Sequence, residues 1–234
     1  MSSARENTRR GFLGQLGISA AALSGIAGLP ESAGAEGPPS PVDDAPVATS
    51  SWDMSCVDRL AGAKYRVAFD THTLSDGLAL DLAATFMDQY HEVYGTTDDQ
   101  TRAVVVMRQL GVQMAFGDAL WDKYAIGEEK KIIDPDTKLP ARRNPWLRAR
   151  AGALPVEAGS SMDRLRERGV IFLACNQASM NLARRYAENT KQDVETVKAE
   201  IRNGLVPGAI LQPTGIFAMI RAQNAGAAFM RGAF

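Results

Sequence analysis

The sequence predicts an α/β protein, built as a three-layer α/β/α sandwich with a mainly parallel central sheet. Short apolar runs with the length of strands alternate along the chain with segments that have helical spacing. The apolar residues of each run are consecutive, which is typical of strands covered on both faces and favours a parallel sheet. The predicted strands are Tyr65–Asp70, Ala103–Arg108, Val170–Cys175 and Ala209–Gln212.

The first predicted helix follows the first strand. Its large apolar side chains recur at every fourth residue, a spacing that places them on one face of a helix. We expect this face to pack in the core. The face consists of Leu78, Leu82, Phe86 and Tyr90.

A later helix is predicted from its ends and its apolar spacing. Asp193 is suited to cap its first turn, because a carboxylate can accept the free backbone N–H groups there. Its buried side is expected to consist of Val194, Val197 and Ile201. Gly204 is suited to the left-handed conformation just after the helix.

The last predicted helix follows the fourth strand. Thr214 is placed to cap it, and Gly226 is placed to stop it. We expect its large apolar residues, Ile216, Phe217 and Ile220, to face inward.

Composition and charge describe an ordinary globular chain. It has 234 residues, of which 45% are hydrophobic and 23% are charged, and this fits one domain with a single sizeable core. The formal net charge of −1 gives no general reason to expect nucleic acid or an anionic membrane as a partner. Any basic site is therefore expected to be local.

The first 35 residues are predicted to be a twin-arginine export signal. Arg9 and Arg10 precede a mildly apolar run that is too short for a stable membrane insertion, which needs about 20 apolar residues. Cleavage is expected after Ala35, and the protein is expected in the periplasm. Residues 36–51 are rich in Pro, Ser and Asp and are predicted to be a disordered linker. The folded domain is then 52–234.

A long inserted loop is predicted at about 125–160, before a helix at Met162–Arg168. Loops of this length in compact domains are uncommon and are often functional. The part at 134–150 is basic around Trp146. It is interpreted as a solvated loop, a lid, a subunit contact or an anion clamp.

The candidate site residues follow from the predicted parallel sheet. Ligands of such sheets gather at the carboxyl ends of the strands, where loops open onto helix N-termini. We expect only a subset of the residues at these ends to be neighbours. The candidates are Asp70, His72, Arg108, Cys175, Asn176, Thr214 and Gly215.

Cys175 is the strongest chemical candidate among them. A thiol in the first turn of a helix lies in the positive end of the helix dipole, which favours the reactive thiolate. The opposing interpretation is a buried structural cysteine, because the residues just before it are core-like.

Metal and nucleotide motifs are missing from the sequence. His72 and His91 flank the first helix and would be separated by about 24 Å, too far to share a metal. The sequence has no CxxC pair, HExxH, GxGxxG, phosphate loop or GxSxG elbow. No cofactor and no metal site are predicted.

Cys56 is the other of the two cysteines of the chain. In an oxidising compartment a Cys56–Cys175 disulfide is conceivable, so Cys56 is a candidate redox partner. The simpler interpretation is a small apolar residue near the start of the domain.

Three segments together resemble the DsrE/DsrF-like family of sulfur-relay and related proteins. They are "YRVAFDTHTLSDGLALDLAATFMDQY", "GVIFLACNQASMNLARR" and "NGLVPGAILQPTGIFAMIRAQNAGAAFM". The last two carry a strand cysteine that opens a helix, an "LVPG" turn and an "R-x-Q-x-x-G" helix.

The resemblance implies a flavodoxin-like fold that assembles into small oligomers. It also implies that Cys175 accepts sulfur as a persulfide and passes it to a protein or a small sulfur compound. The sequence therefore predicts an exported, DsrE-like thiol or persulfide carrier. The alternative is a non-catalytic oligomeric binding or assembly subunit with a structural Cys175.

Overall fold

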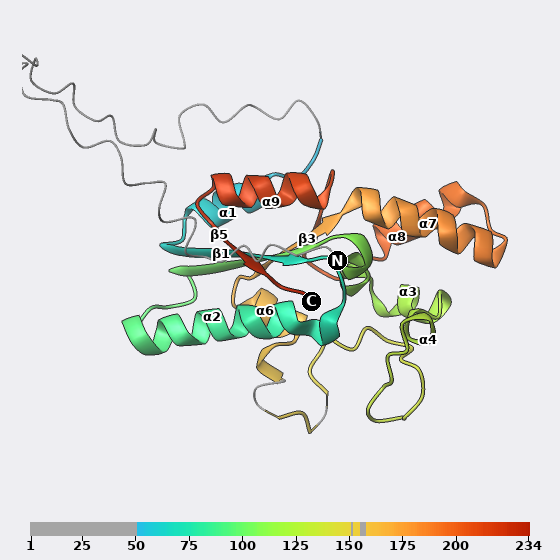
Figure 1. Ribbon diagram of the computed structural model, residues 1–234, viewed down its shortest axis with the longest axis horizontal. Helices are drawn as coiled ribbons and strands as arrows, with labels where there is room; N and C mark the ends of the chain where they lie inside the picture. The colour runs from blue at the N-terminus through green and yellow to red at the C-terminus, as the bar shows by residue number, and fades with distance from the viewer. Residues whose placement is uncertain (1–50, 151, 155–157) are drawn as a thin grey trace, which may run out of the picture. The chain divides into compact units, whose positions relative to one another are not determined.

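A parallel sheet forms the middle layer of the protein and confirms the predicted α/β/α sandwich (Figure 1). The computed structural model describes residues 51–150, 152–154 and 158–234, which belong to one compact unit. All strand pairs are parallel, in the order β4-β3-β2-β1-β5. The strands are β1 (Tyr65–Thr71), β2 (Thr101–Met107), β3 (Ile171–Cys175), β4 (Ala209–Gln212) and β5 (Ala228–Arg231).

The order of the strands decides which helices cover which face. From β1 to β4 each strand lies beside the previous one, in one direction across the sheet. Right-handed connections then place the intervening helices on one face, and the return from β4 to β5 places its helix on the other. In the flavodoxin order the reversal lies between the second and third strands, whereas here it lies between β4 and β5.

The helices of the first face belong to the connections between β1 and β4, and two other helices cover the second face. Figure 1 shows α2 and α6 on one side of the sheet and α1 and α9 on the other. The first face carries α2 (Leu78–Tyr94), α6 (Met162–Glu167), α7 (Asn176–Thr190) and α8 (Val194–Asn203). The second carries α1 (Ser55–Ala61) and α9 (Gly215–Asn224). Shorter elements are η1 (Ser75–Gly77), η2 (Gln109–Ala115), α3 (Asp118–Lys123) and α4 (Ile126–Lys130).

Alternate residues of the strands divide the core into two clusters. Along β3, Phe172 packs with α2 and α7, whereas Ile171 and Leu173 pack with α1 and α9. Both faces of the sheet are therefore covered, which explains why the strands consist of consecutive apolar residues.

The predicted capping residues are confirmed. The Asp193 carboxylate accepts the backbone N–H of Thr196 at 2.8 Å, and the Thr214 hydroxyl accepts that of Phe217 at 3.0 Å. Gly226 follows α9 with a left-handed φ of 85°.

The left-handed conformation expected at Gly204 is wrong. Its φ is −98°, which any residue can adopt. The glycine is needed for close packing instead, because an added Cβ would lie 2.8 Å from the Leu120 side chain. Its carbonyl also accepts the backbone N–H of Gly117 at 2.8 Å, which joins the end of α8 to the start of α3.

The inward orientation expected for Ile216, Phe217 and Ile220 is also wrong. These side chains face outward, and Ile216 and Ile220 are 66% and 52% exposed. The buried side of α9 consists of smaller residues and one methionine, which let the helix lie close to the sheet: Gly215, Ala218, Met219 and Ala222.

The inserted loop is built around Asn144 within its described residues. The Asn144 amide donates to the carbonyls of Met114 at 2.7 Å and Phe116 at 2.8 Å, which ties the loop to η2. The Trp146 ring meets the ring of Trp121 edge-on at 5.8 Å. This part of the loop therefore closes over the core.

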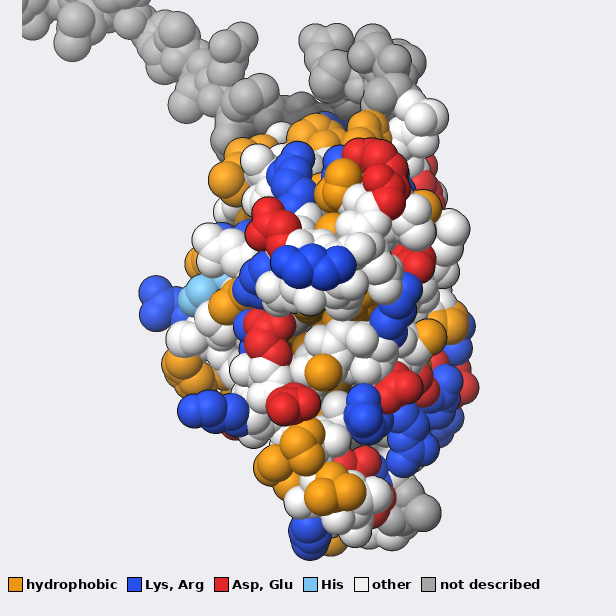
Figure 2. Space-filling model, turned by 90° about the vertical axis from the view of Figure 1, so that its right-hand side faces the viewer, with side chains coloured by type: hydrophobic (Ala, Val, Ile, Leu, Met, Phe, Trp, Pro, Cys, Tyr) orange, Lys and Arg blue, Asp and Glu red, His pale blue; other side chains and the backbone are white. Residues whose placement is uncertain are grey.

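The basic side chains of the loop face acidic partners. Arg148 pairs with Asp118 at 2.7 Å, and Arg142 pairs with Asp122 at 3.1 Å. On the face that carries α3, α4, α7 and α8, Lys and Arg side chains mostly intermingle with Asp and Glu (Figure 2). This arrangement gives the anion-clamp interpretation no support.

The predicted signal at 1–35 and the linker at 36–51 lie outside the described residues, except for Ser51. Within the part of the chain that the structure describes, no helix is long and apolar enough to span a bilayer.

Candidate functional site

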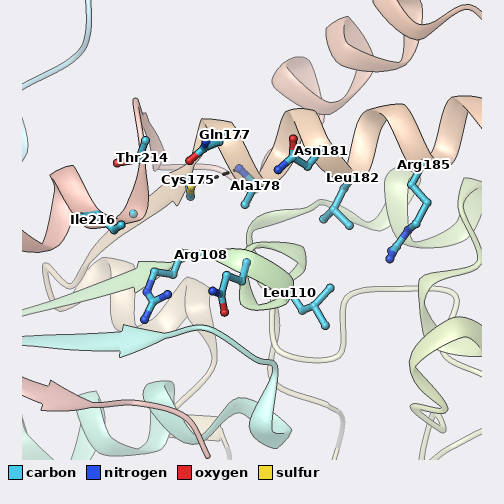
Figure 3. Close-up of a pocket in the computed structure, with 12 residues that line it drawn as sticks. Arg108, Leu110, Cys175, Gln177, Ala178, Asn181, Leu182, Arg185, Thr214 and Ile216 are labelled. Carbon is cyan, nitrogen blue, oxygen red and sulfur yellow. Dashed lines mark hydrogen bonds between the residues drawn. The ribbon is translucent and has the colours of Figure 1, made fainter.

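A cavity of about 360 Å³ opens between the carboxyl ends of β2, β3 and β4 (Figure 3). After β3 the chain enters α7 on one face of the sheet, and after β4 it enters α9 on the other. Adjacent strands whose connections leave toward opposite faces open a crevice, which is where ligands of parallel α/β sheets bind. The candidate site therefore lies at the point that the topology favours.

Cys175 lies at this crevice as the last residue of β3 and the N-cap of α7. Its Sγ accepts the backbone N–H of Ala178 at 3.3 Å, as a serine or threonine oxygen does at other helix starts (Figure 3). The residue is 5% exposed, so what remains accessible of it faces the cavity that it lines. A reactant must therefore enter the cavity to reach the sulfur.

Arg108 lines the cavity just after β2 and is held by Asp70 at the end of β1. The guanidinium donates from Nε and Nη2 to the two carboxylate oxygens, each at 2.6 Å. These hydrogen bonds raise the pKa of Arg108, and the nearby Cys175 adds a smaller electrostatic contribution in the same direction. The charge of Arg108 is thus permanent, and its position is fixed.

Thr214 and Gly215 bring the start of α9 to the same cavity. A Cβ on Gly215 would lie 2.4 Å from the Cβ of Arg108, so a glycine is required for the arginine to pass. The carbonyl of Pro213 accepts the backbone N–H of Gln177 at 3.3 Å. This bond joins the starts of α7 and α9.

Two of the sequence candidates lie elsewhere. Asn176 lines a separate pocket with Trp52 and Asp53, because the residue that follows the N-cap turns away from Cys175. His72 is absent from the lining of the cavity, and its carbonyl accepts the backbone N–H of Gly111. The cavity thus joins Cys175, Arg108, Thr214 and Gly215, with Asp70 behind Arg108.

Sequence reasoning missed the wall that α7 and η2 provide. The α7 residues that line the cavity recur at the spacing of one helical face that starts at Cys175, and this spacing could have predicted them. In Figure 3 the side chains of Leu182 and Arg185 point from α7 toward the segment that carries Leu110. The additional lining residues are Gln109, Leu110, Gln177, Ala178, Asn181, Leu182, Arg185 and Ile216.

Cys56 does not line this cavity and packs in a different part of the core. It lies in the core cluster of α1 and α9, whereas Cys175 packs with the cluster of α2 and α7, and both thiols are free. Burial, and next the charge of Asp53, raises the pKa of the Cys56 thiol. This arrangement gives no support to a Cys56–Cys175 disulfide.

Among the described residues, no group of three or more His, Cys, Asp or Glu side chains is placed to hold a metal ion. Comparison of the chain with protein-family models, with curated proteins and with solved structures finds no match. The functional argument therefore depends on the cavity itself.

Proposed function

We propose that the protein is an exported, DsrE-like sulfur carrier in which Cys175 accepts sulfur as a persulfide and passes it on. The observation that carries the proposal is the position of Cys175, which is the only cysteine in a cavity formed by the described residues at the strand ends. Its Sγ already accepts a backbone N–H from the first turn of α7.

The transfer is a thiol exchange. The Cys175 thiolate attacks the terminal sulfur of a donor R–S–SH, and a new S–S bond forms as the S–S bond of the donor breaks. The electron pair leaves with R–S⁻, and Cys175–S–SH remains. Atoms and electrons balance without an external oxidant or reductant, and attack by an acceptor thiolate on the terminal sulfur releases Cys175 again.

The surroundings of Cys175 suit this exchange. Backbone N–H groups at the start of α7 and the guanidinium of Arg108 favour negative charge beside the sulfur. Burial of the thiol restricts the reaction to reactants that fit the cavity. From the twin-arginine pattern at Arg9 and Arg10 we also propose that the carrier is exported in its folded form and works in the periplasm.

The proposal is tested by selective labelling of the folded, reduced protein. At neutral pH iodoacetamide is expected to label Cys175 and to leave Cys56 unlabelled, because the pKa of Cys56 is raised by burial. Incubation with an organic persulfide is expected to add the mass of one sulfur atom. Cys175→Ser removes both changes, whereas Cys56→Ser keeps them. A folded protein whose Cys175 resists alkylation and takes up no sulfur contradicts the proposal.

The second candidate function is a non-catalytic subunit of a homo-oligomer. It is favoured by the outward apolar stripe of α9, which consists of Ile216, Phe217 and Ile220. A second copy of the chain is the partner that this interpretation requires. Under it, Cys175→Ser leaves assembly intact, and substitution on the α9 stripe destroys it.

A further inference from the structure

We propose that the ligand of the Cys175 cavity is a small organic sulfur compound that carries a negative charge and an apolar body. This inference rests on the proposed function, because it takes Cys175 as the reacting group. It goes further in assigning the donor or acceptor to the class of low-molecular-weight thiols and persulfides with a carboxylate or sulfonate group.

Size is the first argument. The cavity volume of about 360 Å³ lies within the range of about 300–1,000 Å³ for small-molecule sites. Because Cys175 is only 5% exposed, a rigid protein surface cannot bring its own cysteine against Sγ without entering the cavity. A small molecule that enters the cavity meets the part of Cys175 that lines it.

Charge is the second argument. Figure 3 draws 12 lining residues, and among them Arg108 and Arg185 are cationic while none is acidic. Asp70 holds Arg108 through Nε and Nη2, which leaves Nη1 without a hydrogen-bond partner among the described residues. Guanidinium groups therefore line the cavity on two sides, that of Arg108 paired with Asp70 and that of Arg185 paired with Glu129.

Arg185 adds a donor that has no partner within the described part of the chain. Its Nη2 donates to Glu129 at 2.8 Å, but its Nε is buried and makes no hydrogen bond. A buried donor without an acceptor is costly, and native proteins rarely keep one without a reason. Glu129 also pairs with Lys130 at 2.7 Å, so its single charge is shared between two cations. An anionic ligand would satisfy the remaining positive charge.

The remaining lining sets the shape of the ligand. Leu110, Leu182 and Ile216 provide an apolar wall, which suits a short carbon chain. Amide side chains in the lining can bind a carboxylate or a peptide group; they belong to Gln109, Gln177 and Asn181. An inorganic anion would leave the apolar wall uncovered, and a cation would lie against two arginines.

The test uses methanethiosulfonate reagents that differ in charge, of which the anionic and the cationic reagent are similar in size and the neutral one is smaller. The anionic reagent carries a sulfonatoethyl group, the cationic reagent carries a trimethylammonioethyl group, and the neutral reagent carries a methyl group. The rate of Cys175 modification is measured for each in the full protein with Cys56→Ser, and is divided by the rate with a free small thiol. We expect the normalised rate of the anionic reagent to be about ten times that of the cationic reagent at low salt. This ratio should fall as the salt concentration rises.

Arg185→Gln is expected to lower this ratio severalfold, and the unfolding temperature of each variant shows whether it is folded. Arg164→Gln is the matched control: it removes the same charge from an exposed side chain on α6, outside the cavity. The ratio of this control should equal that of the parent protein.

The outcomes separate the inference from the proposed function. If Cys175 reacts with all three reagents at a normalised anion-to-cation ratio of one, the charged-ligand inference is overturned while the carrier function stands. If Arg164→Gln lowers the ratio as much as Arg185→Gln, the preference reflects the net charge of the protein and the inference is overturned as well. If Cys175 reacts with none of the reagents, the proposed function itself fails.

Discussion

At the scale of the residue, the two cysteines show how position decides chemistry. Cys56 and Cys175 are each 5% exposed. Cys56 is surrounded by the core of α1 and α9, whereas Cys175 lines the cavity and accepts the Ala178 N–H. The exposed fraction therefore does not distinguish the two cysteines. Their positions do, because only Cys175 lies at the carboxyl end of a strand, where ligands of parallel sheets bind.

The same rule explains which site residues the sequence could provide. It locates Cys175, Arg108 and Gly215 because each lies just before or just after a strand end. It could not exclude Asn176, because the rotation of a helix after its N-cap depends on packing. It did not extend along α7, so Arg185, which lies between two and three turns into the helix, was missed.

Gly215→Ala is the prediction at this scale. The added Cβ would lie 2.4 Å from the Cβ of Arg108, so the arginine or the start of α9 must move. We expect the free energy of unfolding to fall by about 1–3 kcal/mol, as measured by urea denaturation. Gly62→Ala is the control, because its Cβ meets only the Asp58 carbonyl at an ordinary 3.6 Å. Equal stability of Gly215→Ala and the wild-type protein would show that the close approach is not required.

At the scale of the element, strands were predictable where both faces are buried, and helices where one apolar side stands out. β1 to β4 are recognisable as apolar runs, whereas β5 is only four residues long, and its short apolar run Ala228–Met230 follows closely on the last helix and was not recognised as a strand. The orientation of α9 was predicted wrongly because the helix is apolar on two sides. Small residues pack closer to a sheet than large ones, and the sequence pattern does not measure that distance.

The junction of α3 and α8 supports a prediction about pH. The Lys123 ammonium lies 2.7 Å from the Glu200 carboxylate, and the Tyr124 hydroxyl donates to the same group. These two hydrogen bonds, that from Lys123 first, lower the pKa of Glu200 from its ordinary value of 4.5. A carboxyl with a lowered folded-state pKa stabilises the fold above its unfolded-state pKa, and this contribution disappears as pH falls through the folded-state value.

Glu200→Gln is therefore expected to destabilise the protein at pH 7 by at most about 1 kcal/mol, since the ion pair is partly exposed. At pH values below the folded-state and the unfolded-state pKa of Glu200, the variant and the wild-type protein should have similar stability. Thermal unfolding across this pH range measures the difference. Glu195→Gln breaks a pair on the same helix whose carboxylate is more exposed than that of Glu200, and it should change stability less at either pH. A difference that grows as pH falls would contradict the assignment.

At the scale of the whole molecule, the apolar surface is uneven. The outward stripe of α9 and the edge strand β5 expose large apolar side chains, among them Ile220 at 52% and Phe229 at 52%. Exposed apolar surface and an open strand edge are common at contacts between subunits. This surface supports the predicted homo-oligomer.

Ile220→Glu is the prediction at this scale. A charge in the middle of the α9 stripe is expected to shift the protein from oligomer to monomer in sedimentation velocity. Gln89→Glu adds the same charge at an exposed position of α2, which packs on the other face of the sheet, away from the α9 stripe. It should leave the oligomeric state unchanged. A wild-type protein that sediments as a monomer at high concentration would remove the basis of this interpretation.

Ile216 belongs both to the wall of the Cys175 cavity and to the outward stripe of α9. Whatever covers that stripe also alters the opening through which a reactant arrives. The starts of α7 and α9 are joined besides by the bond from Gln177 to Pro213. If a second copy of the chain covers the stripe, the rate at which Cys175 is modified depends on protein concentration, and a rate measured at one dilution does not describe another.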